Sequence, residues 1–173
     1  MLFRSMYISP LGNIEILCDE MNIKGVWFEN QKYYGAKYKL TDIRNEENRI
    51  IKMVKDWLEE YFSGGQPLID KTILAPEVTE FQSQVLELLE EIPYGQTRTY
   101  KSIADSIAKN GKRSSARAVG GAVGHNPISI LIPCHRVVAV NGSLTGYAGG
   151  INRKIELLAI EGFDRERLEN HQI

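Results

Sequence analysis

Short runs of β-prone residues alternate with turn-forming residues at the start of the chain. The runs cover residues 6–9, 13–18 and 23–28, and residues 10–12 and 19–22, which suit turns, separate them. Runs of this length joined by short connections are typical of antiparallel strands. We therefore expect a small antiparallel meander at the start of the chain.

The pattern changes to a helical period between residues 45 and 62. Apolar residues there recur three or four positions apart, and the sequence 63–67, with two glycines and a proline, ends the run. The apolar positions are Ile50, Ile51, Val54, Trp57, Leu58, Tyr61 and Phe62. A helix with one apolar stripe packs that stripe on a sheet, so we expect this helix to cover one face of the meander.

Residues 66–76 have no strong period and contain two prolines. Such a stretch is typical of a connection between structural units. The sequence therefore predicts an α/β domain with a small antiparallel sheet over residues 1–75, and a mostly helical domain over residues 76–173.

Helix start and stop signals are clear in the second domain. Thr79 and Gln82 have the spacing of a capping box ahead of an apolar stripe that ends at residues 93–95. A second helix follows Thr99, a suitable N-cap, and Asn110-Gly111 ends it. Both helices are expected to pack through one apolar face.

A third, short helix opens at Ser114 or Ser115 and carries small residues. These are Ala116, Ala118, Gly120, Gly121 and Ala122, with Arg117 as the one long side chain. Two helices joined by a tight, glycine-containing turn form a helix-turn-helix pattern. A smooth Gly-Ala surface permits close approach to a DNA minor groove, and it equally permits tight packing on another helix. The composition of the helix leaves both interpretations open.

The length and composition of the chain are typical of a folded protein. The chain has 173 residues, 43% hydrophobic and 25% charged, enough for one medium or two small domains. No segment approaches the roughly 18 apolar residues that a membrane span needs. The first ten residues lack a secretion signal. We expect a monomeric, cytoplasmic protein without a membrane partner.

Charge is distributed unevenly along the chain. The net charge is −1, yet residues 94–154 hold nine basic residues against the single acid Asp105, a local charge of +8 that leaves −9 elsewhere. The basic residues are Arg98, Lys101, Lys109, Lys112, Arg113, Arg117, Arg136, Arg153 and Lys154. A block of one sign suits a surface that neutralises phosphates. The alternative is a solvated basic face with no partner.

Two cysteines and three histidines limit the possible metal chemistry. Cys18 and Cys134 lie far apart in dissimilar surroundings, which favours two thiols over a disulfide. The histidines show no spacing of a structural zinc site. We expect neither a metal nor a cofactor.

Cys134 is followed directly by His135. A free cysteine has a pKa near 8.5, so a reactive one needs a base or a positive neighbour. His135 and Glu161 have the chemistry to supply that. If Cys134 lies in an extended strand, adjacent side chains point to opposite faces, so His135 would act through a bridging water. A Cys-His pair by itself is more often coincidence than a catalytic site.

Several motifs surround this pair in a fixed order. They are Arg-Ala-Val-Gly-Gly at 117–121, Asn-Pro at 126–127, Pro-Cys-His-Arg-Val at 133–137, Gly-Tyr-Ala-Gly-Gly at 146–150 and Glu-Gly at 161–162. This order resembles the O6-alkylguanine-DNA alkyltransferases over residues 79–162. The resemblance implies a ribonuclease H-like first domain and a winged helix-turn-helix second domain. One departure is the connection 109–113, which is longer than is usual in the family and lacks its proline.

The resemblance also implies the reaction and its residues. An alkyl group moves irreversibly from O6 of guanine, with O4 of thymine as a second candidate, to Cys134, once per molecule. The relay runs from Glu161 through His135 and a water to the cysteine. Asn126 fixes the turn ahead of Cys134, and Tyr100 donates a hydrogen bond to the purine ring. Without the motif, Tyr100 would be assigned to a helix core.

The same resemblance assigns substrate and DNA contacts. Tyr147 forms a wall of the base pocket, the peptide N–H of Ala148 contacts O6, and Val137 and Gly146 complete the pocket. The base is flipped out of double-stranded DNA from the minor-groove side, and Arg117 replaces it in the stack. The remaining DNA contacts are Ala116, Gly120, Gly121, Thr99 and Arg136.

Three other functions fit parts of this pattern. An alkyltransferase-like protein binds the lesion without repairing it, and such proteins carry another residue at the position of Cys134. A winged-helix regulator needs long polar side chains on its third helix, which this helix lacks. A Cys-His hydrolase would turn over, and it leaves the basic block unexplained.

Overall fold

The computed structural model describes all 173 residues and divides into two compact units. The first contains Met1–Glu77 and Pro127–Ser129, and the second contains Val78–Asn126 and Ile130–Ile173. Residues 127–129 belong to the first unit because the Val26 amide donates to Pro127 O at 2.8 Å and the Ser129 amide donates to Val26 O at 2.9 Å. The sequence pattern did not indicate this return of the chain.

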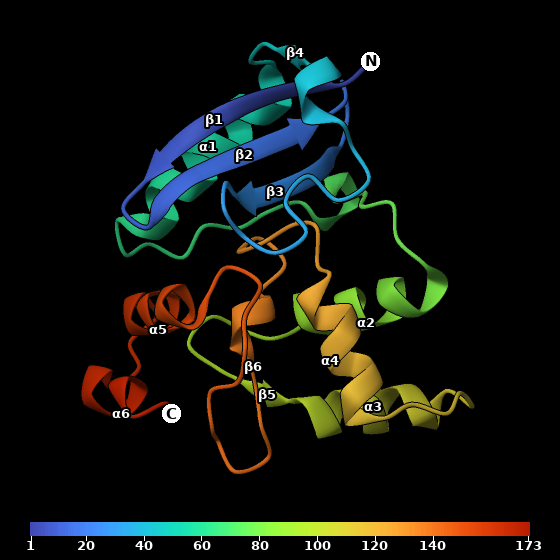
Figure 1. Cartoon of the computed structure of the whole chain (residues 1–173), viewed down its shortest axis with the longest axis vertical. Coiled ribbons are helices and arrows are strands. Elements are labelled where there is room, and N and C mark those ends of the chain that lie inside the picture. The colour runs from blue at the N-terminus through green and yellow to red at the C-terminus, as the bar shows by residue number, and fades with distance from the viewer. The chain divides into compact units, whose positions relative to one another are not determined.

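The sheet of the first unit is a meander with one added strand. β1 (Phe3–Ser9), β2 (Gly12–Cys18) and β3 (Ile23–Phe28) pair antiparallel, as predicted (Figure 1). β4 (Arg44–Asn45) pairs parallel with β1, and the order is β3-β2-β1-β4. The sheet is therefore mixed and not purely antiparallel. The connection that contains the short 3-10 helix η1 (Leu40–Asp42) brings β4 to the free edge of β1 in the same direction.

One helix covers a face of this sheet. α1 (Arg49–Phe62) lies against β1 and β2, in agreement with the prediction (Figure 1). It begins four residues later than the pattern suggested, because the Asn48 side chain accepts a hydrogen bond from the Ile51 amide and caps the helix there. A short 3-10 helix, η2 (Lys71–Ile73), follows in the connection to the second unit.

The second unit is mostly helical. Its elements are α2 (Glu80–Glu90), β5 (Arg98–Thr99), α3 (Tyr100–Lys109), α4 (Ala116–Gly124), η3 (Cys134–Arg136), β6 (Val137–Val138), α5 (Ile151–Ile160) and α6 (Arg165–Glu169). The pattern analysis predicted α2, α3 and α4, and it did not describe α5 or α6. None of the helices has both the length and the apolar character that crossing a membrane requires.

Side-chain caps begin the three predicted helices. Thr79 Oγ1 accepts from the Gln82 amide at 3.2 Å, and Gln82 Oε1 accepts from the Thr79 amide at 3.0 Å, which confirms the capping box. Thr99 caps α3, and Ser115, the second of the two candidates, caps α4. Local hydrogen bonding at these residues fixes where α3 and α4 start.

A two-stranded parallel pairing joins the helix-turn-helix to the cysteine segment. β5 pairs with β6, and Thr99 lies opposite Val138. Because α3 begins at the next residue and β6 follows η3 directly, this pairing brings the start of α3 close to Cys134. The pairing thus assembles residues that are more than thirty positions apart in the sequence.

Candidate functional site

Cys134 lies in a buried turn and not in the extended strand that the sequence suggested. Residues 134–136 form the 3-10 helix η3, and Cys134 is 3% exposed. The Arg136 amide donates to Pro133 O at 3.0 Å, which closes the turn. Asn126 Nδ2 donates to Ile132 O at 2.9 Å, so the asparagine does hold the segment ahead of the cysteine. The argument from alternating strand faces therefore does not apply to His135.

Polar groups surround the Cys134 sulfur despite its burial. Burial raises the pKa of the thiol, whereas hydrogen bonds from the side chains of Asn126 and Tyr147 and the positive charge of Lys154 lower it. The net shift is upward, so the resting protein holds a thiol and not a thiolate. Because the thiolate is the nucleophile, a reaction at Cys134 requires that a nearby base remove the thiol proton.

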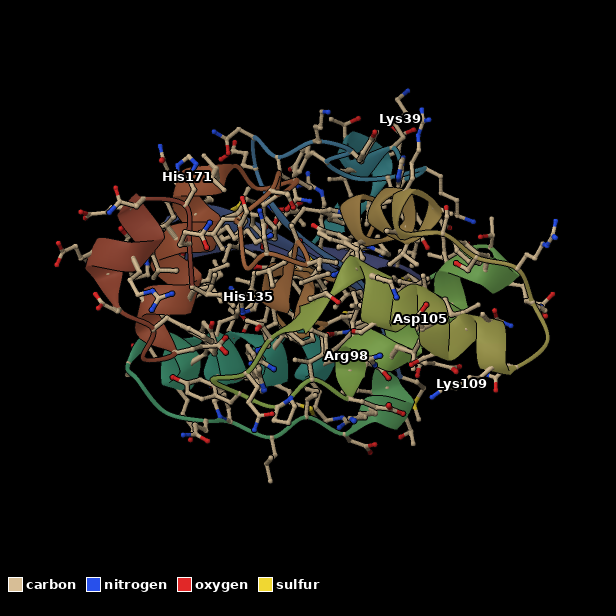
Figure 2. All side chains as sticks on the ribbon, turned by 90° about the horizontal axis from the view of Figure 1, so that it is seen from below. Lys39, Arg98, Asp105, Lys109, His135 and His171 are labelled. Carbon is tan, nitrogen blue, oxygen red and sulfur yellow. The ribbon has the colours of Figure 1, made fainter.

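His135 and Glu161 form a buried pair next to this turn. His135 Nε2 lies 2.6 Å from Glu161 Oε2, and neither side chain is exposed to solvent. Figure 2 shows His135 among the helices of the second unit. Burial alone would raise the pKa of Glu161, but hydrogen bonds from His135 and Arg136 and the positive charge of Arg136 outweigh it and lower the pKa to about 2. Glu161 is therefore an anion that accepts hydrogen bonds.

An ionised Glu161 determines the state of the imidazole. The carboxylate accepts the proton on His135 Nε2, which leaves Nδ1 as the basic nitrogen. Burial lowers the pKa of His135, and the contact with Glu161 opposes this shift. The net shift is downward, so the imidazole is neutral at pH 7 and is able to accept a proton.

Arg136 is part of this buried network. Its Nε donates to Glu161 Oε1 at 2.8 Å, and its Nη1 donates to Ile92 O at 2.6 Å. The residue is 9% exposed. We predicted a DNA contact for Arg136, but the structure places its guanidinium inside the second unit, where it neutralises Glu161 and satisfies a backbone carbonyl.

Lys154 is a second buried cation. It has no solvent exposure, and its Nζ donates to Val137 O at 2.7 Å. Burial lowers the pKa of Lys154 to about 8, and the charge of Cys134 opposes this shift. A lysine is almost never buried without a functional or electrostatic partner. The amine therefore supplies positive charge to the cysteine region.

A surface hollow of about 420 Å³ opens beside α3 and α4. Its lining consists of Tyr100, Ala116, Arg117, Gly120, Thr145 and Gly146. Five of these six residues were predicted from the sequence to contact substrate or DNA. Tyr100 is partly exposed, and a Cβ on Gly120 would lie 3.9 Å from its ring, so Tyr100 lines the hollow and is not a core residue of α3.

The small residues of α4 face outward. Ala116, Ala118 and Gly121 are exposed, and a Cβ built on Gly121 would meet no atom within 4 Å. The opposite side of α4, which includes Val119 and Ala122, is buried. Of the two interpretations of the Gly-Ala surface, the structure favours an accessible face over packing on another helix.

The other predicted site residues differ in their surroundings. Val137 is buried in β6, and its carbonyl accepts from Lys154. Tyr147 and Ala148 are half-buried in the loop before α5. The Thr99 hydroxyl accepts the Ser102 amide at 3.0 Å, so it has a capping role within α3.

The basic block is less uniform than its sequence suggests. Lys101, Lys109, Lys112, Arg113 and Arg117 are exposed, and the Lys109 side chain points outward at the end of α3 (Figure 2). By contrast, Arg136 and Lys154 are buried, and Arg98 donates to Ser102 O and to Ser106 Oγ. The exposed positive charge is therefore concentrated around α3 and α4.

Sequence reasoning missed two residues, Lys154 and Thr145. Lys154 was counted with the surface charges, since a lone lysine gives no sign of its burial. Thr145 Oγ1 lies 2.9 Å from the Tyr100 hydroxyl. The two residues are 45 positions apart in the sequence, so no local pattern reveals this contact. The position of Thr145 directly before the Gly-Tyr-Ala-Gly-Gly motif was the only signal available.

Two family models match the chain. The model of the 6-O-methylguanine DNA methyltransferase ribonuclease-like domain matches residues 2–72, and that of the DNA binding domain of the same family matches residues 80–163. The methylated-DNA--protein-cysteine methyltransferase of Methanosarcina acetivorans is 43% identical over 161 residues, which are 93% of this chain and 99% of that protein.

Solved structures agree with the family models. A crystal structure of the Mycobacterium tuberculosis O6-methylguanine methyltransferase is 38% identical, covers 93% of both chains and has a TM-score of 0.80. A crystal structure of the enzyme from the same organism in complex with DNA is 38% identical, covers 92% of both chains and also has a TM-score of 0.80. Matches over both units and nearly the full length leave no alternative assignment: the chain belongs to the 6-O-methylguanine DNA methyltransferase family.

Proposed function

We propose that this protein repairs DNA directly by moving a methyl or larger alkyl group from O6 of guanine in duplex DNA to Cys134. O4 of thymine is a second candidate position from which the alkyl group could be removed. The observation that carries the proposal is the buried His135–Glu161 pair beside Cys134. The side chain of Asn126 forms a hydrogen bond to the sulfur of this cysteine. Relatives over the full length are named methylated-DNA--protein-cysteine methyltransferases, which supports the same reaction.

Proton removal from the thiol is the first requirement. His135 is neutral and presents Nδ1 as its basic nitrogen, while Glu161 holds Nε2. The thiol proton passes to Nδ1, through the bridging water that the family resemblance implies. The resulting imidazolium is stabilised by the Glu161 carboxylate, and the thiolate by Lys154 and by the hydrogen bonds from Asn126 and Tyr147.

The second step is a displacement at the alkyl carbon. The sulfur of Cys134 forms a bond to that carbon as the bond from the carbon to O6 breaks, and the electron pair of the broken bond goes to guanine. The guanine anion takes up a proton, which balances the proton lost by the thiol. A hydrogen bond from Tyr100 to the purine ring stabilises the developing negative charge. The thioether is not reversed by water, so each molecule acts once.

Access to the base requires its removal from the duplex. The target atom lies inside the helix, so the nucleotide must be extruded at a cost of a few kcal/mol. The exposed Ala116, Ala118 and Gly121 on α4 allow a close approach to the groove, and Arg117, exposed at the start of α4, has the length to fill the vacated stack. The Mycobacterium tuberculosis relative was crystallised with DNA, which supports duplex DNA as the partner.

Cys134 separates this proposal from its main alternative. A lesion-binding protein of the alkyltransferase-like type needs no nucleophile, whereas this chain has a cysteine held in a hydrogen-bonded site beside a base. We further propose that the protein acts as a monomer in the cytoplasm, where its thiols stay reduced.

The test is the fate of the alkyl group. The protein is incubated with a duplex that contains O6-methylguanine, and the peptides are analysed by mass spectrometry. One methyl group per protein on the Cys134 peptide is expected. The Cys134→Ala variant should bind the duplex and acquire no methyl group. Multiple turnovers, or a methyl group on another residue, would refute the proposal.

A further inference from the structure

The Tyr100 hydroxyl has a protein partner that the proposed mechanism does not use. Tyr100 Oη and Thr145 Oγ1 share a hydrogen bond of 2.9 Å, in which either oxygen is able to donate. Both residues line the hollow beside α3 and α4. A substrate base that contacts Tyr100 in this hollow therefore also meets Thr145.

Thr145 is held in place by its neighbour in the chain. Leu144 is 5% exposed and packs in a cluster with Leu158 and Leu168. Its amide donates to His171 O at 2.8 Å. Because the residue before Thr145 is anchored by both packing and a backbone hydrogen bond, the threonine hydroxyl is presented to Tyr100 from a fixed position.

The Tyr100 hydroxyl has only one proton to donate, and this determines the role that is left for Thr145. A phenol has one proton to donate and lone pairs that accept. If that proton goes to the purine ring, the Tyr100 oxygen is left to accept, and the Thr145 hydroxyl is the donor at hydrogen-bond distance. A phenol that accepts a hydrogen bond is a better donor, because linked hydrogen bonds polarise one another.

We infer that Thr145 is a positioning residue for Tyr100: its hydroxyl donates to the Tyr100 oxygen and directs the phenol proton toward the substrate base. This inference rests on the proposed function, since it concerns the donor to the leaving guanine. Burial raises the pKa of Tyr100, and the hydrogen bond from Thr145 lowers it, in the direction that favours donation.

The test uses variants that separate shape from hydrogen bonding. Thr145→Val keeps the shape and removes the hydroxyl, whereas Thr145→Ser keeps the hydroxyl. We measure the single-turnover rate of methyl transfer at saturating duplex DNA. Thr145→Val should slow transfer about threefold to tenfold, the effect of one hydrogen bond, and Thr145→Ser should restore the rate to within about twofold of the unmodified protein.

A double-mutant cycle with Tyr100→Phe tests whether the effect passes through the phenol. In the Tyr100→Phe background, Thr145→Val should cause no further decrease in the transfer rate, because the phenol hydroxyl that Thr145 orients is absent. An unchanged rate for Thr145→Val, an equal loss in the Tyr100→Phe background, or a failure of Thr145→Ser to restore the rate would each overturn the inference. Absence of methyl transfer by the unmodified protein would instead refute the proposed function.

Discussion

Glu161 binds His135 and Arg136 with the same carboxylate. Its Oε2 lies 2.6 Å from His135 Nε2, and its Oε1 accepts from Arg136 Nε at 2.8 Å. The imidazole that we propose as the base is thus oriented by a carboxylate that a buried arginine holds in turn. We therefore expect both the orientation of the imidazole and the stability of the second unit to depend on Glu161.

Replacing Glu161 should therefore damage both properties. Glu161→Gln removes the negative charge that stabilises the imidazolium, so methyl transfer should slow by about 100-fold or more. It also leaves Arg136 buried without its anion, at a cost of about 3 to 5 kcal/mol in the free energy of unfolding. Single-turnover kinetics and urea unfolding measure the two effects.

Glu156→Gln, which loses an exposed pair with Arg165, is the matched control and should change stability by less than about 1 kcal/mol. Equal behaviour of the two variants would contradict this account.

Lys154 should matter for the reaction. Its charge lowers the pKa of Cys134, so Lys154→Met, which keeps the length of the side chain, should slow methyl transfer about tenfold or more at pH 7. An exposed lysine on α1 provides the control: Lys52→Met should leave the rate unchanged. A Lys154→Met protein as fast as the unmodified one would mean that the buried amine serves only packing.

The same lysine predicts a pH dependence of stability. Its pKa is about 8 in the folded protein and near 10.4 in the unfolded chain. Between these values the unfolded chain binds more protons, so this group makes stability rise as the pH increases from 8 to 10. Below pH 8 its destabilising effect is complete. Urea unfolding should show that the stability of the unmodified protein relative to Lys154→Met increases across this window. A constant difference would show that Lys154 titrates normally.

Substitutions at Arg136 and Arg113 should distinguish the effect of a buried positive charge from that of an exposed one. Arg136→Met should lower the free energy of unfolding by about 3 to 5 kcal/mol, because Glu161 loses its buried partner, and it should leave the salt dependence of DNA binding unchanged. Exposed Arg113 should behave in the opposite way. Arg113→Gln should leave stability within about 0.5 kcal/mol and reduce the slope of log affinity against log salt by about 1 if it contacts a phosphate. A reduced slope for Arg136→Met would contradict this account and would support the DNA contact that the sequence predicts for Arg136.

Much of the fold was predictable because its signals are local. The strands of the meander and the starts of α2, α3 and α4 follow from turn residues and from caps such as Thr79 and Ser115. β4 has only two residues, and its pairing with Phe3 and Arg4 depends on tertiary contacts that no local pattern encodes. For the same reason the return of residues 127–129 to the first unit was not foreseen.

The candidate site was predictable where motifs carry it. The family resemblance singled out Cys134, His135 and Glu161, and the structure brings the last two into contact across 26 residues. The expected conformation of the cysteine segment was wrong: Cys134 was placed in an extended strand, whereas backbone hydrogen bonds close a 3-10 turn there. The burial of Arg136 and Lys154 was missed, because a count of charges assigns every basic residue to the surface.

Gly121 offers a test of the proposed DNA surface. A Cβ at this position meets no atom within 4 Å, and the backbone is helical, so Gly121→Ala should stabilise the protein by up to about 1 kcal/mol and bind duplex DNA nearly unchanged. Gly121→Leu starts from the same exposed position with open space around its Cβ, and it adds bulk that should hold the helix away from the groove. Its dissociation constant for duplex DNA, measured by fluorescence anisotropy, should rise about tenfold or more, while urea unfolding shows no loss of stability. Unimpaired binding by Gly121→Leu would mean that DNA contacts another face, and impaired binding by both variants would mean that the groove tolerates no side chain there at all.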